Sequence, residues 1–179
     1  EDNYQRYRLT PSGVSPMSLP GMAGGRYTAE GLEHNEAGIP SVRPGDHLQQ
    51  LNKRRDKLTR FDYGEYWADI QGAGSTAIIT WGAPTGAARE QLACSGKFDG
   101  GLRLIALRLL APEQPERMAV ALDGVSRLLV VEHSHGGQFY KYLRSCYDLP
   151  DDTRLFCRPG PLPILAAEIA CQLEQWNKP

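Results

Sequence analysis

The sequence lacks both a long hydrophobic run and a surplus of charge of either sign. A membrane-spanning helix needs about 20 consecutive apolar residues, and no stretch of this chain approaches that length. The formal net charge is only −1 over 179 residues, so the composition provides no basic field for binding nucleic acid. We therefore expect neither a membrane nor a nucleic acid among the partners of the chain.

Paired cysteines are also missing, although the chain has four cysteines. None of them lies in a C-x-x-C pair, the spacing typical of structural zinc sites and many iron–sulfur sites. Three of the four lie inside apolar segments, which favours buried free thiols over disulfides or metal ligands. Buried thiols indicate a reducing compartment, so we expect a cytoplasmic protein and no metal site in this chain. The four residues are Cys94, Cys146, Cys157 and Cys171.

No nucleotide-binding fingerprint and no catalytic-triad signature is present. The turn Gly82–Gly86 lies between a predicted strand and a predicted helix, where a phosphate could bind to the helix N-terminus. It matches neither G-x-G-x-x-G nor a P-loop, which favours a structural turn. Gly136-Gly137-Gln138 lies at the equivalent place two strands later and leaves the same alternatives open. Gln138 could contact a partner from that helix start.

Regular structure is sparse in the first third of the chain. Residues 1–44 contain many glycines and prolines, which preclude long helices and strands, and their apolar residues have no periodicity. We expect at most a short strand at Arg6–Leu9, and we expect this segment to pack on something else. A helix is predicted at His47–Leu58, with Asp46 as its N-cap. Its basic triplet Lys53-Arg54-Arg55 could bind phosphate or an acidic surface, but its place near the helix C-terminus favours a solvated face.

From Ser75 onward, strand-like and helix-like segments alternate. Four strands alternating with four helices require a mostly parallel sheet with helices on both faces, and we therefore predict an α/β fold. A linker with aromatic anchors, Thr59–Gly74, precedes it. The predicted strands are Ala77–Trp81, Leu102–Leu110, Leu128–Glu132 and Thr153–Arg158. The predicted helices are Thr85–Cys94, capped by Thr85 or its neighbour, Pro115–Leu122, Gly137–Cys146 and Pro163–Trp176.

The most informative stretch of this half is Leu128–Arg144, which reads as a buried strand, a glycine turn and a helix. In open α/β sheets, ligands meet the chain at the carboxyl ends of such strands, so we expect any chemistry near Glu132–Gln138. His133 and His135 share a side if the strand continues, which makes a metal site conceivable. Glu132, the nearby acid, lies on the other face, and this disfavours the metal site.

A compact polar cluster, Glu33-His34-Asn35-Glu36, lies between Gly31 and Gly38 in the first third. Polar residues concentrated in a loop are typical of functional sites. The cluster could supply acid and base groups, or it could bridge subunits. Its spacing alone does not establish catalysis.

Three blocks, taken together in order and spacing, resemble the alpha subunit of 2-oxoacid:ferredoxin oxidoreductases, most closely the 2-oxoglutarate type. The run Gly31-Leu32-Glu33-His34-Asn35-Glu36-Ala37-Gly38 is the most specific of them. The resemblance covers essentially all of this chain and only the C-terminal part of such a subunit. The blocks are Gly13–Gly21 continuing through Gly24-Gly25 to Gly38, then Ile78–Gly82 with the helix after it, and then Val130–Glu132 with Gly137-Gln138 and Gly160-Pro161.

The resemblance implies that residues 1–64 are the tail of a thiamine-pyrimidine-binding domain plus a linker, and that residues 65–179 form a transketolase C-terminal-like domain. It also implies an enzyme that oxidatively decarboxylates a 2-oxoacid on thiamine diphosphate and Mg. Electrons then pass through [4Fe-4S] clusters to ferredoxin, and an acyl-CoA forms. In this family the thiamine-activating glutamate precedes the matching region, and a beta subunit carries the GDG motif and the cluster cysteines. We therefore expect no complete active site and no cofactor bound by this chain alone.

No catalytic residue can be transferred from the family to this chain, so the resemblance implies only residues that approach a substrate or partner. Two other functions stay open: a non-catalytic α/β binding or interaction module, and a nucleotide-binding domain, which the missing fingerprint disfavours. The substrate- or partner-proximal residues we predict are Met17, Met22, Gly24, Gly25, Glu33, His34, Glu36 and Gln138.

Overall fold

The computed structural model of the chain describes residues 4–96 and 101–176, and it divides into two compact units between Asp62 and Tyr63. The division lies close to the boundary expected at residue 64. The assignment of the first unit to a thiamine-pyrimidine-binding domain stays a prediction.

The first unit consists of turn-rich chain and one helix, α1 (Pro44–Thr59). An isolated bridge between His34 and Pro40 is the β-pairing recorded in its described residues. The predicted strand at Arg6–Leu9 is wrong, because this segment is a turn in which side chains of α1, rather than a neighbouring strand, hydrogen-bond to the Tyr7 carbonyl oxygen.

Helix α1 begins earlier than predicted, and its N-cap is Arg43 rather than Asp46. Pro44 takes the first helical position, where its fixed φ favours the helix and its missing N–H costs nothing. Asp46 lies in the first turn, where a carboxylate suits the helix dipole, and it accepts a hydrogen bond from the Ser41 hydroxyl.

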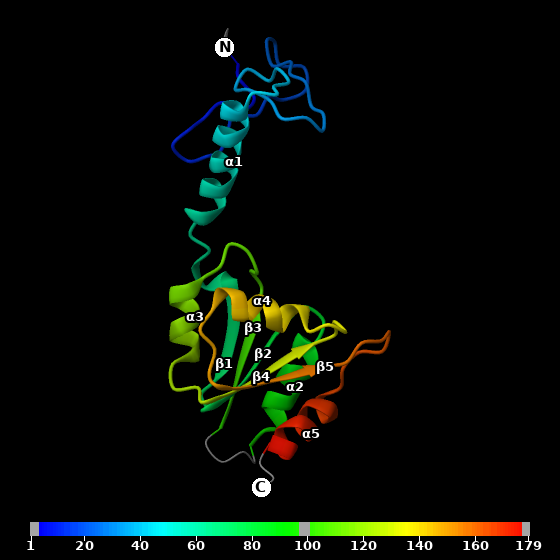
Figure 1. Ribbon diagram of the computed structural model, residues 1–179. Helices are drawn as coiled ribbons and strands as arrows, with labels where there is room; N and C mark the ends of the chain where they lie inside the picture. The colour runs from blue at the N-terminus through cyan, green and yellow to red at the C-terminus, as the bar shows by residue number, and fades with distance from the viewer. Residues whose placement is uncertain (1–3, 97–100, 177–179) are drawn as a thin grey trace. The chain divides into compact units, whose positions relative to one another are not determined.

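The second unit is a five-stranded sheet with strand order β1-β3-β2-β4-β5, in which β2, β3, β4 and β5 are parallel. The predicted α/β class and mostly parallel sheet are confirmed (Figure 1). The strands are β1 (Ala68–Gly72), β2 (Thr76–Trp81), β3 (Leu102–Leu107), β4 (Arg127–Glu132) and β5 (Asp152–Cys157). The helices are η1 (Gly64–Trp67), α2 (Thr85–Cys94), α3 (Pro115–Leu122), α4 (Gln138–Cys146) and α5 (Ala166–Trp176).

The predicted linker Thr59–Gly74 is wrong over its second half, because that half forms the short helix η1 and the edge strand β1. Strand β1 runs antiparallel to β3, in register from Ala68 opposite Leu107 to Gly72 opposite Arg103. The strand contains one large apolar residue, Ile70, so its own sequence shows little alternation. Pairing with β3, far along the chain, determines this strand rather than its local pattern.

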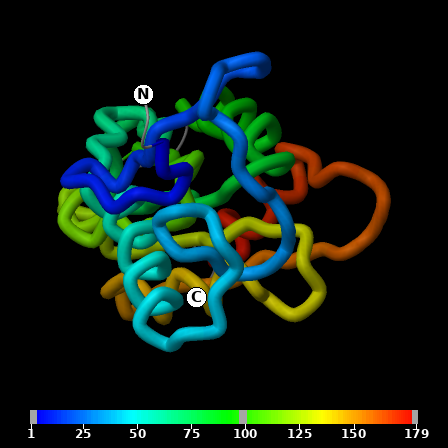
Figure 2. The backbone as a smooth tube through the Cα atoms, turned by 90° about the horizontal axis from the view of Figure 1, so that it is seen from above, coloured from blue at the N-terminus to red at the C-terminus, as the bar shows by residue number. Residues whose placement is uncertain are grey.

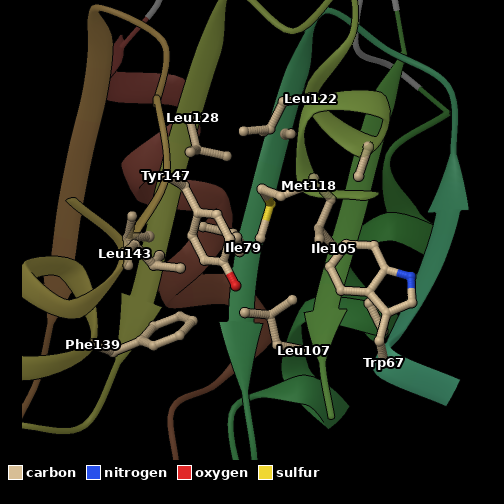
Figure 3. Close-up of a cluster of buried hydrophobic side chains, with 14 residues drawn as sticks. Trp67, Ile79, Ile105, Leu107, Met118, Leu122, Leu128, Phe139, Leu143 and Tyr147 are labelled. Carbon is tan, nitrogen blue, oxygen red and sulfur yellow. The ribbon is translucent and has the colours of Figure 1, made fainter. Parts of the chain in front are cut away.

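Successive residues of the central strands point to opposite faces of the sheet, and helices cover both faces. On one face, Ile79 packs with Met118 of α3 and Leu143 of α4 (Figure 3). On the other face, Ile78 packs with Ala88 of α2 and Ile169 of α5. Helices α2 and α5 lie together on that second side (Figure 2). These two buried clusters hold β2 and β4 in place, and the candidate site lies between the ends of these two strands.

Several predicted details of the second unit need correction. Strand β3 ends at Leu107 rather than Leu110, and α5 begins at Ala166 rather than Pro163, because the residues past each boundary form bends and turns around prolines.

All four cysteines are free, but none is buried: Cys94 and Cys171 are exposed on their helices. Within residues 4–96 and 101–176, no helix is both long and apolar enough to span a bilayer.

Candidate functional site

A cavity of about 420 Å³ lies at the carboxyl ends of β2 and β4 in the second unit. This is the edge of the sheet where the sequence predicted chemistry, near Glu132–Gln138. Its walls are mostly apolar and aromatic, with a few polar groups at the mouth. The lining residues are Trp81, Gly82, Ala83, Pro84, Leu110, Glu132, His133, Ser134, Gln138, Phe139 and Tyr142.

The carboxylate of Glu132 caps the N-terminus of α4. This residue ends β4, and its side chain is only 3% exposed. Its Oε2 accepts a hydrogen bond from the backbone N–H of Phe139 at 3.0 Å, and its Oε1 accepts one from the backbone N–H of Tyr140 at 2.9 Å. The Ser134 hydroxyl donates to Oε2 as well, and the Ser134 oxygen accepts the N–H of Gln138 at 2.9 Å. The positive end of the helix dipole also stabilises a negative charge at this position.

This cap settles one of the alternatives left by the sequence. A phosphate at Gly136-Gly137-Gln138 would need the first amides of α4, and Glu132 and Ser134 already occupy three of them. The turn therefore has a structural role. Gly137 has a φ of +62°, and a Cβ atom there would lie 2.8 Å from Leu155 Cδ2, so the turn requires glycine.

The start of α2 differs from that of α4. The N-cap residue is Pro84, the neighbour of Thr85 and one of the two predicted positions, but it makes no side-chain hydrogen bond to the helix. Thr85 is the first helical residue, and its N–H donates to the Gly82 carbonyl oxygen at 3.1 Å. The amide end of α2 therefore borders the cavity without a carboxylate of its own.

The two histidines after β4 do not form a metal site. His133 contacts the Arg158 carbonyl oxygen through Nδ1 at 3.1 Å, while His135 is exposed. Among the described residues, no three His, Cys, Asp or Glu side chains converge where they could hold a metal ion. The side chains present therefore do not fit a magnesium site or an iron–sulfur cluster within this stretch.

In the first unit, Glu33 is held by two side chains of α1, Arg54 and His47. The Arg54 guanidinium donates to both carboxylate oxygens, at 3.2 Å and 2.7 Å, and His47 Nδ1 lies 2.9 Å from Oε2. The hydrogen bond from Arg54 is the main reason that the pKa of Glu33 falls from 4.5 to about 2. Glu33 is therefore a fixed anion that ties its loop to the helix, rather than a proton carrier near neutral pH.

His34 lies beneath this network and is 3% exposed. Its ring stacks on Tyr7 with 4.8 Å between ring centroids, and its Nε2 is buried without a hydrogen bond, 3.7 Å from Glu30. Glu36 accepts the backbone N–H of Leu9 at 2.8 Å. The structure thus brings Glu33, His34 and Glu36 together as an internally bonded loop, and their proximity to a substrate or partner stays a prediction.

The other residues predicted to approach a substrate or partner do not form one cluster. Met17 is 75% exposed, and Met22 is also exposed. Gly25 is buried, and a Cβ atom there would lie 2.8 Å from Ser18 Cβ, so the chain folds tightly at this point. Gly24 has a φ of +71°, which only glycine adopts without strain. Gln138 belongs to the second unit, where its exposed side chain borders the cavity.

Sequence reasoning missed the residues that support these loops. Lys53 donates to the Tyr7 carbonyl oxygen at 2.8 Å and to the Ser15 hydroxyl oxygen at 2.9 Å, so the predicted solvated face is wrong for Lys53. Arg54 also binds Glu33, but its side chain is exposed, as predicted. Burial is the main reason that the pKa of Lys53 lies below its usual range, with the positive charge of Arg54 adding to the effect. No periodic signal marks these contacts, because they join residues more than 20 positions apart.

Comparison with known proteins identifies relatives for nearly the whole chain. No protein-family model matches it. The alpha subunit of 2-oxoacid:ferredoxin oxidoreductase 1 from Sulfurisphaera tokodaii is 29% identical over 174 residues, with 93% of this chain and 26% of that relative covered. The alpha subunit of 2-oxoacid:ferredoxin oxidoreductase from Saccharolobus solfataricus is 30% identical over 148 residues, with 78% of this chain and 23% of the relative covered. The chain thus spans about a quarter of the length of these curated relatives.

A solved structure gives the same result. The 2-oxoglutarate:ferredoxin oxidoreductase from Magnetococcus marinus, with 2-oxoglutarate, coenzyme A and succinyl-CoA bound, matches with a TM-score of 0.80 and 26% identity. The match covers 97% of this chain and 30% of that chain. The resemblance predicted from the three sequence blocks is confirmed: the curated homologues of this chain are alpha subunits of 2-oxoacid:ferredoxin oxidoreductases.

Proposed function

We propose that this chain is part of a thiamine diphosphate-dependent 2-oxoacid:ferredoxin oxidoreductase that converts 2-oxoglutarate, coenzyme A and oxidised ferredoxin to succinyl-CoA, CO₂ and reduced ferredoxin. The observation that carries the proposal is the match along 97% of this chain to a 2-oxoglutarate:ferredoxin oxidoreductase, at a TM-score of 0.80. The choice of 2-oxoglutarate rests on the substrates named for that neighbour. Thiamine diphosphate, Mg and [4Fe-4S] clusters would reside on other parts of the assembly.

Within such an enzyme, this portion provides scaffold and subunit interface. The buried carboxylate Glu132 and the paired Glu33 both serve internal hydrogen bonds, and the side chains described here do not converge on a metal. The first unit instead exposes many large apolar residues, which soluble surfaces rarely gather unless another protein covers them. They include Val14, Met17, Leu19, Leu32, Ile39, Val42, Leu48 and Leu51.

The partner implied by this proposal is a beta subunit, with ferredoxin and coenzyme A meeting the full complex. A reducing, cytoplasmic setting suits the four cysteines, all of which are free thiols. No observation favours the non-catalytic module over the enzyme.

The test is a native purification of the natural protein together with whatever binds it. We expect a brown complex with a second subunit that reduces viologen only when 2-oxoglutarate and coenzyme A are both present. Activity with pyruvate in place of 2-oxoglutarate would keep the enzyme class and change the substrate. A colourless single chain that stays inert with added thiamine diphosphate and Mg would contradict the proposal and favour a binding module.

A further inference from the structure

The cavity of the second unit lies at the topological switch point of the sheet. In the order β1-β3-β2-β4-β5, the connection after β2 leads to β3 on one side, and the connection after β4 leads to β5 on the other. Helix α2 packs on one face of the sheet, and α4 packs on the opposite face. The two loops therefore diverge and leave a crevice between the carboxyl ends of β2 and β4. Ligands of open α/β sheets bind in such a crevice.

Aromatic side chains form the walls of this crevice. Trp81 ends β2 with 46% of its surface exposed, although its neighbours in the strand are fully buried. The Phe139 ring lies 6.3 Å from that of Trp81, tilted by 50°. Tyr142 completes the wall, and its hydroxyl donates to the Leu110 carbonyl oxygen, which fixes the ring. A half-exposed tryptophan beside fixed rings provides a stacking surface for a planar ligand.

The polar groups at the mouth of the crevice favour a ligand that carries no negative charge where it faces α4. The Glu132 carboxylate and Ser134 already occupy the amides of α4, so that helix end offers no anion site. His133 must donate from Nδ1 to the Arg158 carbonyl oxygen when its ring is neutral, which leaves Nε2 as an acceptor. The exposed Gln138 amide can both donate and accept. These groups match the donor and acceptor edge of a heteroaromatic ring.

We propose that this crevice binds a neutral planar heteroaromatic ring, such as a nucleobase, stacked on Trp81 with its edge bonded by Gln138 and His133. The volume of about 420 Å³ is within the usual range for small-molecule sites. The proposal rests on the crevice of this chain and not on the oxidoreductase function proposed above. The ring could belong to a free nucleoside or to a nucleotide whose phosphate reaches the open end of α2.

The test uses the complete natural protein and isothermal titration with adenosine, AMP, ribose and inorganic phosphate as probes. We expect adenosine to bind while ribose and phosphate do not. Tighter binding of AMP than of adenosine would assign the ring to a nucleotide, and equal or weaker binding would assign it to a nucleoside. Trp81→Leu should weaken adenosine binding at least about fivefold, the least that base stacking on an aromatic ring contributes. Gln138→Ala should weaken it by about threefold or more.

Tyr66→Leu is the matched control, because Tyr66 is an exposed aromatic residue of the same unit outside the cavity. It should leave adenosine binding unchanged. Both test residues are exposed, so circular dichroism should show the fold intact in each variant. The proposal is overturned if adenosine fails to bind the wild-type protein, if Trp81→Leu binds it as tightly as wild type, or if phosphate alone binds as well as AMP.

Discussion

At the residue scale, Glu132 joins the end of β4 to the start of α4. It is buried, and its two oxygens accept hydrogen bonds from Ser134, Phe139 and Tyr140. In Glu132→Gln, an amide nitrogen replaces one acceptor oxygen and must face an N–H or O–H donor. The negative charge that the positive end of the helix dipole stabilises is also lost. We expect the free energy of unfolding to fall by about 1–3 kcal/mol in urea denaturation.

Glu90→Gln is the control for this change, since Glu90 is an exposed residue on α2. Its unfolding free energy should stay within about 0.5 kcal/mol of wild type. A Glu132→Gln variant that is as stable as Glu90→Gln would show that the carboxylate cap contributes nothing to the second unit.

A second residue-scale prediction concerns the fixed anion in the first unit. Replacing Arg54 by Gln removes the main cause of the lowered pKa of Glu33, so the pKa should rise from about 2 toward 4.5. A pH titration of the Glu33 carboxyl carbon by NMR measures this directly. Because the folded pKa is lowered, Glu33 stabilises the fold fully above about pH 4.5, and this stabilisation is lost as the pH falls toward 2.

Arg55→Gln is the matched control, because Arg55 bonds to Asp56 and not to Glu33. The titration of Glu33 should not change in that variant. If Arg54→Gln leaves the pKa of Glu33 near 2, the guanidinium is not what holds this carboxylate ionised.

The residues of the candidate sites were only partly predictable from the sequence. Glu33, His34 and Glu36 were identifiable because polar residues gather in a glycine-flanked loop. Arg54 and Lys53 were not, since their partners lie far along the chain and α1 resembles an ordinary basic helix. Trp81 was predicted as the end of a strand, and only the fold shows that its side chain borders a cavity.

At the scale of elements, the edge strand β1 depends on a close approach of two backbones. Gly72 ends it with a φ of +73°, and a Cβ atom there would lie 2.2 Å from the Leu102 carbonyl oxygen. Gly72→Ala should therefore break the pairing at this end and lower the free energy of unfolding by about 2 kcal/mol or more. Thermal and urea unfolding of the second unit would measure the loss.

Gly86→Ala, in the same unit, should have the opposite effect on the free energy of unfolding. Gly86 lies inside α2, and a Cβ atom there meets nothing within 4 Å. The substitution should stabilise the protein by about 0.5–1 kcal/mol, because alanine favours the helix and restricts the unfolded chain. Equal effects of the two substitutions would contradict the assigned backbone geometry.

The parallel strands and their helices were predictable because each carries a local hydrophobic pattern of the right period. Strand β1 was not, because Ala68–Gly72 is mostly polar and small, and its partner β3 lies more than 30 residues away. The predicted start of α1 was wrong for a different reason. Asp46 is a residue type that favours the N-cap position, but the helix begins earlier, at Pro44.

At the scale of the whole molecule, α1 exposes leucines, while the hydrogen bonds that tie it to the loops of the first unit come from Gln50, Lys53 and Arg54. Leu48 and Leu51 are 59% and 44% exposed, whereas Gln50 is buried and Lys53 bonds to the loop. The double substitution Leu48→Gln and Leu51→Gln should leave the fold unchanged and reduce copurification of the second subunit at least severalfold. Gln49→Ala, on the same helix, is the control. Unchanged copurification in the double variant would show that α1 is not at the interface.

One assay can compare this chain alone with the assembly that it is proposed to join. Viologen reduction is measured with 2-oxoglutarate, coenzyme A, thiamine diphosphate and Mg, first on the isolated polypeptide and then on the assembly purified with its second subunit. We expect no reduction by the chain alone, and reduction by the assembly that stops when either substrate is omitted. Reduction by the isolated chain would contradict the scaffold role, and an inert assembly with an intact second subunit would contradict the proposed enzyme.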